Sequence, residues 1–491
     1  MNRNDPGLCE PYELVTLNES VSTFRDPAGQ LYLTPSHAIR RIHPESAAQT
    51  RVFLDSEFRA GLELSGDLVA TEIVAPATNA AVDAGELWLR HPRIDPISYP
   101  WEWTTGQWRS AADLTLRLAG RGIDAGWNLK DATPLNIIFH GAQPVLVDVL
   151  SFEPRDPNSA VWLAYGQFVR TFLLPLLAAK YLKWPLEATL FWRDGYEPAM
   201  LYRALPPWQR FHPHLLDVVT LATLLEKPAK SGQQTRKVAG VSDPALARHI
   251  LHKRFARLAK QIRHATQTDQ TSQWSGYEKA ATHYGSSDVE SKQQFVQRVL
   301  DRCRPVRVLD IGANTGTYSL LATEAGAQVV ALDSDRGALD ILWRTANRDK
   351  KAVAPLVANI ARPTPAAGWR NREQLSLLKR LGGDFDMVLM LAVIHHLILR
   401  EQAPLGHIGE LCSTLTRRWL ILEWVPPSDP MFQEWMRGRD DLYGHLSEDD
   451  LIRAFALWFR VVDRATLDNQ RTLLLMERTD ASGSTTGDRR G

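Results

Sequence analysis

Residues 307–318 read RVLDIGANTGTY and combine an acid with two glycines at the end of a predicted strand. Glycine lets a ligand approach the backbone closely and tolerates positive φ, so Gly312 and Gly316 are suited to a binding loop. A predicted helix that begins near Thr317 would direct its amide dipoles at the same point. Ligands of α/β sheets lie beyond the carboxyl ends of the strands, and Asp310 stands at such an end. The segment therefore predicts a binding site for a small molecule.

Two kinds of ligand use loops of this type, and the residue types distinguish them. A dinucleotide places its pyrophosphate on a GxGxxG loop, and this segment lacks that spacing. The carboxylate of Asp310 would repel a pyrophosphate but attract the ammonium group of S-adenosylmethionine (SAM), which also carries a positive sulfonium. An acid at the end of the next predicted strand can hold both ribose hydroxyls. Asp333 in VVALDSD has that place, with Asp335 as the alternative, so the pattern favours SAM as the cofactor.

The motifs VLDIGANTGTYS and VVALDSD, with the order of strands and helices around them, resemble the class I SAM-dependent methyltransferases. The resemblance covers residues 276–478 and implies that Asp333 contacts the ribose. The family usually has an acid beside the adenine amino group, where this chain has Asn359, whose side-chain oxygen would accept that hydrogen bond. The resemblance also implies that the methionine end of the cofactor contacts the loop residues Asp310, Gly312, Asn314 and Gly316.

Methyl transfer is a direct displacement that rests on positioning and, where needed, on removal of a proton from the acceptor. The fourth predicted strand ends in LMLAVIHHLI, which places His395 and His396 on the rim that would face the methyl group. Each is a candidate general base because imidazole titrates near neutral pH, and a histidine that hydrogen-bonds loop backbone is the alternative. Glu423 and Asp429, in ILEWVPPSDP after the fifth strand, would hold the acceptor, and Glu423 is a further candidate catalytic residue.

Two further segments are predicted to cover this pocket. The insertion TPAAGWRNREQLSLLKR would form a lid with Trp369, Arg372 and Glu373 near the pocket. Upstream, SGYEKAATHYG would supply Tyr277 and Tyr284 as aromatic walls of the cofactor site. Simple core packing is the alternative for these aromatic residues. No third ligand stands at a suggestive spacing from the two histidines, so we predict no zinc or other metal site.

The residues that carry these motifs alternate predicted strands and helices, which indicates an α/β domain with a Rossmann-like, doubly wound sheet. A short turn joins the last two strands, so the last strand must be antiparallel. The predicted strands are 306–311, 328–333, 355–359, 385–391, 419–423, 459–465 and 472–478. The predicted helices are 317–325, 337–347, 404–415 and 447–457.

The segment LKDATPLNIIFHGAQPVLVDVLSFE, in the N-terminal half, carries a second set of polar residues. Asp131, Asn136 and Asp148 are spaced like the catalytic loop and the metal-binding acid of kinase-like folds, closest to the small-molecule kinases. The resemblance implies an α+β domain in which Asp131 orients a hydroxyl, whereas the other two residues hold magnesium. Arg40 stands where such folds have a lysine, with Glu57 as its candidate partner.

Departures from that pattern argue against phosphate transfer. The segment has no GxGxxG loop ahead of it, and Leu129 replaces the usual histidine of the catalytic triplet. The planar fork of Arg40 does not substitute for an ammonium group. We therefore expect an inactive, degenerate domain that presents or recognises the acceptor, with YPWEW (99–103) near the hinge between its lobes. An active phosphotransferase is the alternative.

The boundaries of these regions follow changes in composition. A hairpin, VSTFRDPAGQLYLTP, is predicted at the start of the kinase-like domain. The linker is predicted to contain a helix from Asp243 to about His264, with one apolar and one basic face. The basic face is typical of a solvated helix, with a contact to RNA, acidic lipid or an acidic substrate as the alternative. The predicted regions are an N-terminal arm (1–20), the kinase-like domain (21–240), a basic helical linker (241–275), the methyltransferase domain (276–478) and a disordered tail (479–491).

The composition is that of an ordinary globular protein. The 491 residues carry a net charge of +1, which gives no global attraction to nucleic acid or acidic lipid. The three cysteines form no CxxC pair, which argues against a disulfide framework and fits a reducing compartment. The most apolar stretch, from Thr171, contains Lys180, Lys183 and Glu187, so we predict no membrane span. The start of the sequence lacks the pattern of a signal peptide, and we expect a cytoplasmic protein.

The leading hypothesis is a SAM-dependent methyltransferase that modifies a small-molecule or glycan-like acceptor. Both halves, including WNLKDATPLNI and HHL, resemble bacterial two-part methyltransferases, some of which are linked to rhizobial nodulation. A non-catalytic SAM-binding scaffold or sensor and a bifunctional kinase–methyltransferase are the alternatives. Nucleic acid is not an expected partner.

Overall fold

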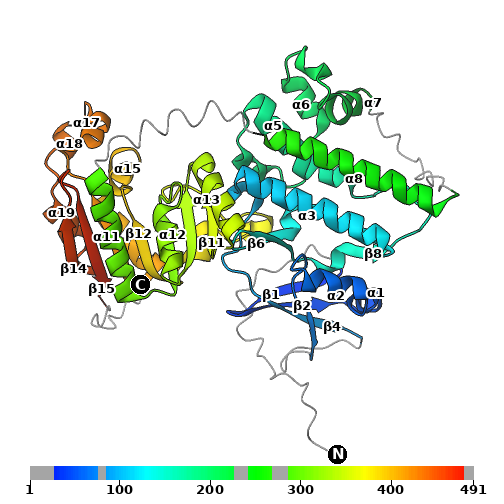
Figure 1. The fold of residues 1–491 in the computed structure, drawn as a ribbon, viewed down its shortest axis with the longest axis horizontal. Coiled ribbons are helices and arrows are strands. Elements are labelled where there is room, and N and C mark those ends of the chain that lie inside the picture. The colour runs from blue at the N-terminus through cyan, green and yellow to red at the C-terminus, as the bar shows by residue number, and fades with distance from the viewer. Residues whose placement is uncertain (1–26, 76–84, 226–241, 268–285, 439, 480–491) are drawn as a thin grey trace, which may run out of the picture. The chain divides into compact units, whose positions relative to one another are not determined.

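The structure is a computed structural model that describes residues 27–75, 85–225, 242–267, 286–438 and 440–479. The chain folds as two compact units (Figure 1). Unit 1 comprises Met1–Thr268 and Ala366–Leu375, and unit 2 comprises Asp269–Pro365 and Ser376–Gly491. The arm 1–20, most of the tail 479–491 and the two tyrosines Tyr277 and Tyr284 lie outside the described residues. Within the described ranges, no helix is long and apolar enough to span a membrane.

Unit 2 is built on a seven-stranded sheet with the strand order β11-β10-β9-β12-β13-β15-β14. The strands from β11 to β13 in this order are parallel, whereas β15 is antiparallel to both β13 and β14. The predicted α/β alternation and the antiparallel last strand are therefore observed. The strands are β9 (Arg307–Ile311), β10 (Gln328–Asp333), β11 (Val353–Val357), β12 (Phe385–Met390), β13 (Thr416–Trp424), β14 (Phe459–Thr466) and β15 (Thr472–Arg478).

The central strands of unit 2 are apolar on both sides of the sheet. Leu309 and Val388 lie side by side on one face of the sheet and are fully buried. Their chain neighbours Val308 and Leu389 point to the other face and are fully buried as well, as expected for parallel strands that are covered on both faces. The helix α19 begins with the predicted capping box, in which Ser447 and Asp450 bond each other's backbone. The helices are α11 (Ser286–Cys303), α12 (Thr317–Glu324), α13 (Arg336–Asp349), α14 (Leu377–Leu381), α15 (Ile394–Leu399), α16 (Leu405–Leu415), α17 (Pro430–Met436), α18 (Asp440–Tyr443) and α19 (Glu448–Phe455).

Unit 1 contains a four-stranded antiparallel sheet with the order β1-β2-β4-β3 and two further pairs, β5 with β8 and β6 with β7. We predicted a hairpin whose second arm is β1, but β1 pairs with the strand that follows it, β2. The first arm of that predicted hairpin lies outside the described residues. The strands are β1 (Gly29–Leu33), β2 (His37–Ile42), β3 (Glu72–Val74), β4 (Leu87–Pro92), β5 (Trp127–Leu129), β6 (Ile137–His140), β7 (Gln143–Leu146) and β8 (Phe152–Pro154).

The helix that we assigned to a linker instead belongs to the core of unit 1. α8 (Pro244–Thr266) buries Leu251, Phe255 and Leu258 in the same hydrophobic cluster as α3 (Thr105–Asp124), because its apolar face needs a partner (Figure 1). On its polar face, Arg257 pairs with Asp217 at 2.5 Å. The other helices are α1 (Pro44–Leu54), α2 (Glu57–Leu64), α4 (Tyr165–Phe168), α5 (Leu174–Leu182), α6 (Pro198–Ala204) and α7 (Ala222–Leu225).

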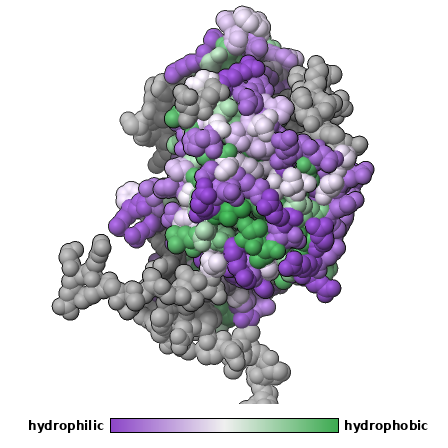
Figure 2. Space-filling view, turned by 90° about the vertical axis from the view of Figure 1, so that its left-hand side faces the viewer, coloured by the Kyte–Doolittle hydropathy of each residue, from purple (hydrophilic) through white to green (hydrophobic). Residues whose placement is uncertain are grey.

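The side of the molecule shown in Figure 2 is largely hydrophilic, with a hydrophobic area among hydrophilic residues. Exposed apolar side chains of unit 2 include Val306 and Leu457, which are 65% and 75% exposed. Apolar atoms contribute more than half of the surface of ordinary folded proteins, so scattered residues of this kind do not mark an interface.

Candidate active site

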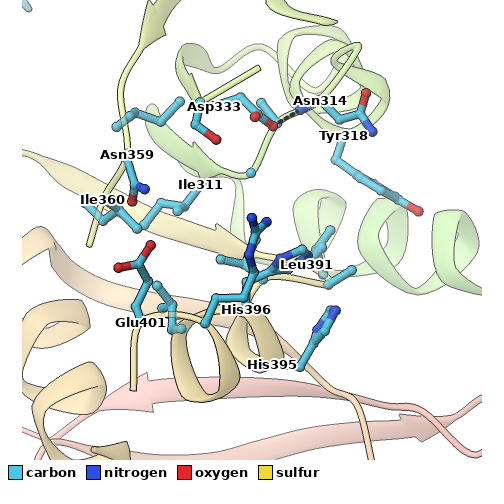
Figure 3. Close-up of a pocket in the computed structure, with 18 of the residues that line it drawn as sticks. Ile311, Asn314, Tyr318, Asp333, Asn359, Ile360, Leu391, His395, His396 and Glu401 are labelled. Atoms are coloured by element: carbon cyan, nitrogen blue, oxygen red, sulfur yellow. Dashed lines mark hydrogen bonds between the residues drawn. The ribbon is translucent and has the colours of Figure 1, made fainter. Parts of the chain in front are cut away.

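A cavity of about 880 Å³ in unit 2 lies at the carboxyl ends of β9, β10, β11 and β12 (Figure 3). Parallel strands end at the same edge of a sheet, so four loops contribute side chains to one place. Of the residues that the sequence predicted to bind a cofactor or to act in catalysis, those that line the cavity are Gly312, Asn314, Asp333, Asn359, His395 and His396.

The loop between β9 and α12 has the backbone conformation that its glycines predict. Gly312 and Gly316 have φ values of 76° and 90°, in the left-handed region that favours glycine. A Cβ atom on Gly312 would collide with the side chain of Val393, and one on Gly316 would collide with Leu342. Asn314 also has a positive φ, 53°, which asparagine tolerates better than most residues. The loop therefore passes close to its neighbours and exposes backbone to the cavity.

Asp333, the last residue of β10, presents its carboxylate to the cavity in a fixed orientation. Its Oδ2 accepts a hydrogen bond of 2.8 Å from the backbone N–H of Asn314, and its Oδ1 accepts one of 2.8 Å from that of Asp335 (Figure 3). Each oxygen keeps further lone-pair capacity for a hydroxyl group. Burial raises the pKa of Asp333, and these amides oppose that rise. The alternative residue, Asp335, instead caps α13 through the N–H groups of Gly337 and Ala338.

Asp310 lies behind the cavity wall, which corrects the expectation that it faces a ligand directly. Its side chain is within β9, the residue is 2% exposed, and its Oδ2 accepts a hydrogen bond of 2.6 Å from the hydroxyl of Ser319 in α12. Burial raises the pKa of Asp310 to about 6. β9 continues for one residue beyond the acid, so the acid sits inside the sheet and not at its rim.

Asn359 and Glu401 share one end of the cavity. Asn359 follows β11 by two residues, and its Oδ1 accepts a hydrogen bond of 2.8 Å from the backbone N–H of Ala361. Glu401 follows α15 by two residues and pairs with Arg362, with 3.0 Å between its Oε2 and the arginine Nε. Glu401 could not be found from the sequence, because a lone acid after a short helix matches no motif.

The two histidines begin α15 and pack on Trp435, with ring-centroid distances of 5.5 Å for His395 and 4.2 Å for His396. His395 is 1% exposed, and its ring nitrogens have no hydrogen-bond partner among the described residues. Burial lowers the pKa of His395 to about 2 and that of His396 to about 4. Both rings are therefore neutral at physiological pH and both line the cavity, but His395 is almost fully buried whereas His396 is half-buried and the more accessible of the two.

Glu423 and Asp429 do not stand on the rim as predicted. Glu423 is fully buried, and its carboxylate lies 2.5 Å from the Nζ of Lys292 and 3.3 Å from the Nη1 of Arg471. Asp429 pairs with the Nε of the same arginine at 2.8 Å. The two carboxylates and the two cationic side chains thus form a buried network of ion pairs, because buried charges need partners of opposite sign. Lys292 and Arg471, which the sequence did not indicate, are the members that reach the cavity wall.

The predicted lid residues are not part of this cavity. Ala366–Leu375, which includes Trp369, Arg372 and Glu373, groups with unit 1. There the carboxylate of Glu373 pairs with Arg193 and accepts a hydrogen bond from the backbone N–H of Trp369. None of the three residues lines the cavity of unit 2.

A second cavity, of about 570 Å³, lies within unit 1 and brings together Asp131, Asn136 and Asp148, as their spacing predicted. Asp148 pairs with Arg40 at 2.7 Å and accepts a hydrogen bond of 2.7 Å from Ser151. The amide of Asn136 donates to the same serine hydroxyl at 3.1 Å. Glu57, the expected partner of Arg40, is instead exposed at the start of α2. Across the described chain, no group of three or more His, Cys, Asp or Glu side chains is arranged to hold a metal ion.

The chain is similar to a known nodulation protein over almost its whole length. No protein-family model matches the chain. The chain is 28% identical to nodulation protein NoeA of Rhizobium meliloti (strain 1021) over 470 residues, which cover 93% of this chain and 96% of NoeA.

Solved structures align with part of the chain only. The bifunctional kinase–methyltransferase WbdD aligns with a TM-score of 0.30 and 20% identity over 39% of this chain and 40% of WbdD. Magnesium protoporphyrin IX methyltransferase (ChlM) of Synechocystis PCC 6803 aligns with a TM-score of 0.31 and 17% identity over 42% of this chain and 94% of ChlM. The N-methyltransferase NodS of Bradyrhizobium japonicum WM9 aligns with a TM-score of 0.30 and 12% identity, over 39% of this chain and 97% of NodS.

Proposed function

We propose that unit 2 binds SAM and transfers its methyl group to a small-molecule or glycan-like acceptor. The observation that carries this proposal is the carboxylate of Asp333, which two backbone amides aim into a cavity at the carboxyl ends of parallel strands. An acid held in this way suits the two hydroxyls of a ribose. The strand order, with a parallel core and an antiparallel β15, supports this proposal, because the resemblance to class I methyltransferases implies a Rossmann-like sheet with an antiparallel last strand.

The proposed arrangement assigns one part of the cofactor to each loop. The ribose lies on Asp333, the methionine end on the backbone of the Gly312–Gly316 loop, and the adenine between the loops that follow β11 and α15. Asp310 acts indirectly, because its bond to Ser319 holds the first turn of α12 against β9. The N-terminal end of α12 then faces the methionine carboxylate with its positive dipole.

SAM supplies an activated methyl group, and the chain supplies position and a proton acceptor. His396, neutral and accessible, would take the proton from an acceptor hydroxyl or amine as the new bond forms. Trp435 and Tyr318, which both line the cavity, offer ring faces to a flat or sugar-like acceptor. Lys292 and Arg471 are already neutralised by Glu423 and Asp429, so we expect no selection for an anionic acceptor.

Substitution of Asp333 tests the proposal. Asp333→Asn places an amide donor against backbone donors and removes the charge, so SAM affinity measured by titration calorimetry should fall about 10- to 100-fold. Asp335→Asn is the matched control, because asparagine caps a helix as well as aspartate does. The proposal is wrong if both variants bind SAM like the wild type, or if a nicotinamide dinucleotide takes the cavity instead. SAM binding without release of S-adenosylhomocysteine in a metabolite extract would favour the non-catalytic alternative.

We propose in addition that unit 1 has a kinase-like fold that recognises the acceptor and does not transfer phosphate. The support is the pair of Arg40 and Asp148, because an acid bound to an arginine is not available to hold magnesium. Titration with Mg–ATP tests this directly, and we expect no submicromolar binding. Tight binding together with phosphate transfer would favour the bifunctional alternative.

A further inference from the structure

The end of the unit 2 cavity that holds Asn359 and Glu401 presents one hydrogen-bond donor and one acceptor. The oxygen of Asn359 is identified by its bond from the backbone N–H of Ala361, because an N–H group can only donate. The Nδ2 of Asn359 and the Oε1 of Glu401 make no hydrogen bond with any other group in the described residues. Both side chains line the cavity. A ligand there meets an amide donor beside a carboxylate acceptor.

Arg362 holds these two groups next to each other. Its backbone N–H donates to the carbonyl of Asn359 at 3.1 Å, which closes a tight turn after β11. Its side-chain Nε donates to Glu401 at 3.0 Å, which ties the segment after α15 to the same turn. Figure 3 shows the amide of Asn359 and the carboxylate of Glu401 directed toward one another. One arginine therefore fixes both the donor and the acceptor.

We propose that Asn359 and Glu401 together read the amidine edge of a purine, in which a ring nitrogen that accepts lies beside an amino group that donates. The Nδ2 of Asn359 donates to the ring nitrogen, and the carboxylate of Glu401 accepts from the amino group. This inference rests on the proposed function and makes adenine the base that the site selects. It also changes the role that the sequence predicted for Asn359, because its oxygen accepts from Ala361 whereas its Nδ2 makes no hydrogen bond in the described residues and is the group offered to the base.

The pairing explains how the site works without an acid after β11. Glu401 supplies the negative charge from a different loop, and a charged acceptor makes a stronger hydrogen bond than an amide oxygen. An acid at position 359 would remove the donor and set two carboxylates against each other. Asn359→Asp should therefore weaken the binding of an adenine ligand, although the family pattern predicts that it should strengthen it.

Two ligands that differ at this edge provide the test. S-adenosylhomocysteine has the adenine pattern, whereas S-inosylhomocysteine reverses it, with a donor at the ring nitrogen and an oxygen in place of the amino group. In the full-length chain we expect calorimetry to show about 100-fold preference for the adenine compound, since mismatched buried polar groups are rejected strongly. The amide of Glu401→Gln can present its oxygen to the amino group of adenine or its NH2 to the oxygen of hypoxanthine. This variant should therefore reduce the preference at least about tenfold.

Control variants separate this inference from the proposed function. Glu324→Gln removes an exposed acid that pairs with Lys351 far from the cavity lining, and it should leave the preference unchanged. If the adenine compound binds but Glu401→Gln keeps the wild-type preference, the inference is wrong while the proposed function stands. A tighter complex with Asn359→Asp would overturn it as well. If neither compound binds the wild-type chain, the proposed function itself fails.

Discussion

The cavities of the two units differ in what their acids are bound to. In unit 2, Asp333 is held by backbone amides and Glu401 by a single arginine contact, so each carboxylate keeps capacity for a ligand. In unit 1, Asp148 is bound to the guanidinium of Arg40 and to the hydroxyl of Ser151. The motif residues line one cavity in each unit, but both oxygens of Asp148 in unit 1 are engaged, whereas Asp333 and Glu401 in unit 2 keep capacity for a ligand.

The comparison shows that spacing and availability are separate properties of a site. The spacing of Asp131, Asn136 and Asp148 predicts a magnesium site, and the structure does place them around one cavity. Arg40 and Ser151 engage both oxygens of Asp148, and the arginine supplies a counter-charge, so the electrostatic reason to bind a cation is weakened there. Arg362, by contrast, engages only the Oε2 of Glu401.

The largest effect is expected from His396→Ala, because general-base catalysis typically contributes about 10²- to 10⁴-fold. Turnover should fall by that amount while SAM affinity changes little. Transfer of a deuterated methyl group into a metabolite extract, followed by mass spectrometry, measures it. Since the pKa of His396 is lowered to about 4, the ring accepts protons throughout the range above that value. Activity should therefore be lost only as the pH falls toward about 4.

The exposed His407 in α16 lies outside the cavity lining and provides the control for that experiment. His407→Ala should retain full turnover. Equal turnover in both variants would remove His396 from the mechanism, and the contrast between the units would then rest on binding alone.

Gly312→Ala tests whether the loop of unit 2 must pass as close to Val393 as the structure shows. The new methyl group would collide with that valine and also strain a residue with positive φ, so SAM affinity should fall about 100-fold. Gly326 also has a positive φ, 93°, but a Cβ atom there would meet nothing. Gly326→Ala therefore carries the backbone strain without the collision. Equal losses in the two variants would show that strain, not close approach, limits the loop.

Arg40→Met should destabilise unit 1 locally by about 2 kcal/mol, because it leaves the largely buried Asp148 without its counter-charge. Asp148→Asn in addition should restore most of that loss, since the amide still accepts from Ser151. Hydrogen exchange of the amides in β2 and β7 of the full chain measures the effect, because a chain of two units need not unfold in two states. If Arg40→Met leaves hydrogen exchange in β2 and β7 unchanged, Arg40 does not stabilise the charge of Asp148, and the contrast between the two cavities is lost.

The sequence was informative where a local pattern determines local structure. The apolar runs and glycine turns placed the strands of unit 2 within two residues of the observed bounds for β9, β10, β11 and β12. Asp333 and the Gly312 loop could be found because strand ends in a parallel sheet converge by geometry. Burial was harder to predict: Asp310 and Glu423 occupy strand positions whose side chains turn inward, and no spacing rule shows which acid is inside.

Interactions between distant segments could not be predicted from the sequence. Lys292 and Glu423 are 131 positions apart, and neither lies in a motif that names the other. The amphipathic helix α8 was assigned to a linker because its pattern shows that it needs a partner, but not which one. Glu401 lines the cavity beside Asn359, and Arg362, 39 positions away in the sequence, contacts both residues.

The smallest effect concerns Asp310, whose carboxylate lies behind the loop and whose pKa is raised to about 6. Lys292, Ser319 and Asp333 are the polar groups that act on it. A cationic ligand favours the ionised carboxyl, so SAM affinity should rise only a few-fold as the pH increases from about 5 to about 7. Asp310→Asn keeps a hydrogen bond with Ser319 and should flatten that dependence.

The carboxyl of Asp310 should affect the stability of the fold with the opposite pH dependence. Its raised pKa can therefore be tested without a ligand. The folded chain holds this proton more tightly than the unfolded chain, because burial disfavours the charge. The contribution of Asp310 to stability is therefore fully present below the ordinary aspartate pKa of about 4 and is lost as the pH rises through about 6. Asp333 contributes in the same direction, so the difference between wild type and Asp310→Asn isolates one carboxyl. If hydrogen exchange in β9 shows the same pH dependence in both proteins, Asp310 is ionised as readily as an exposed acid, and the cavity of unit 2 has a charged wall after all.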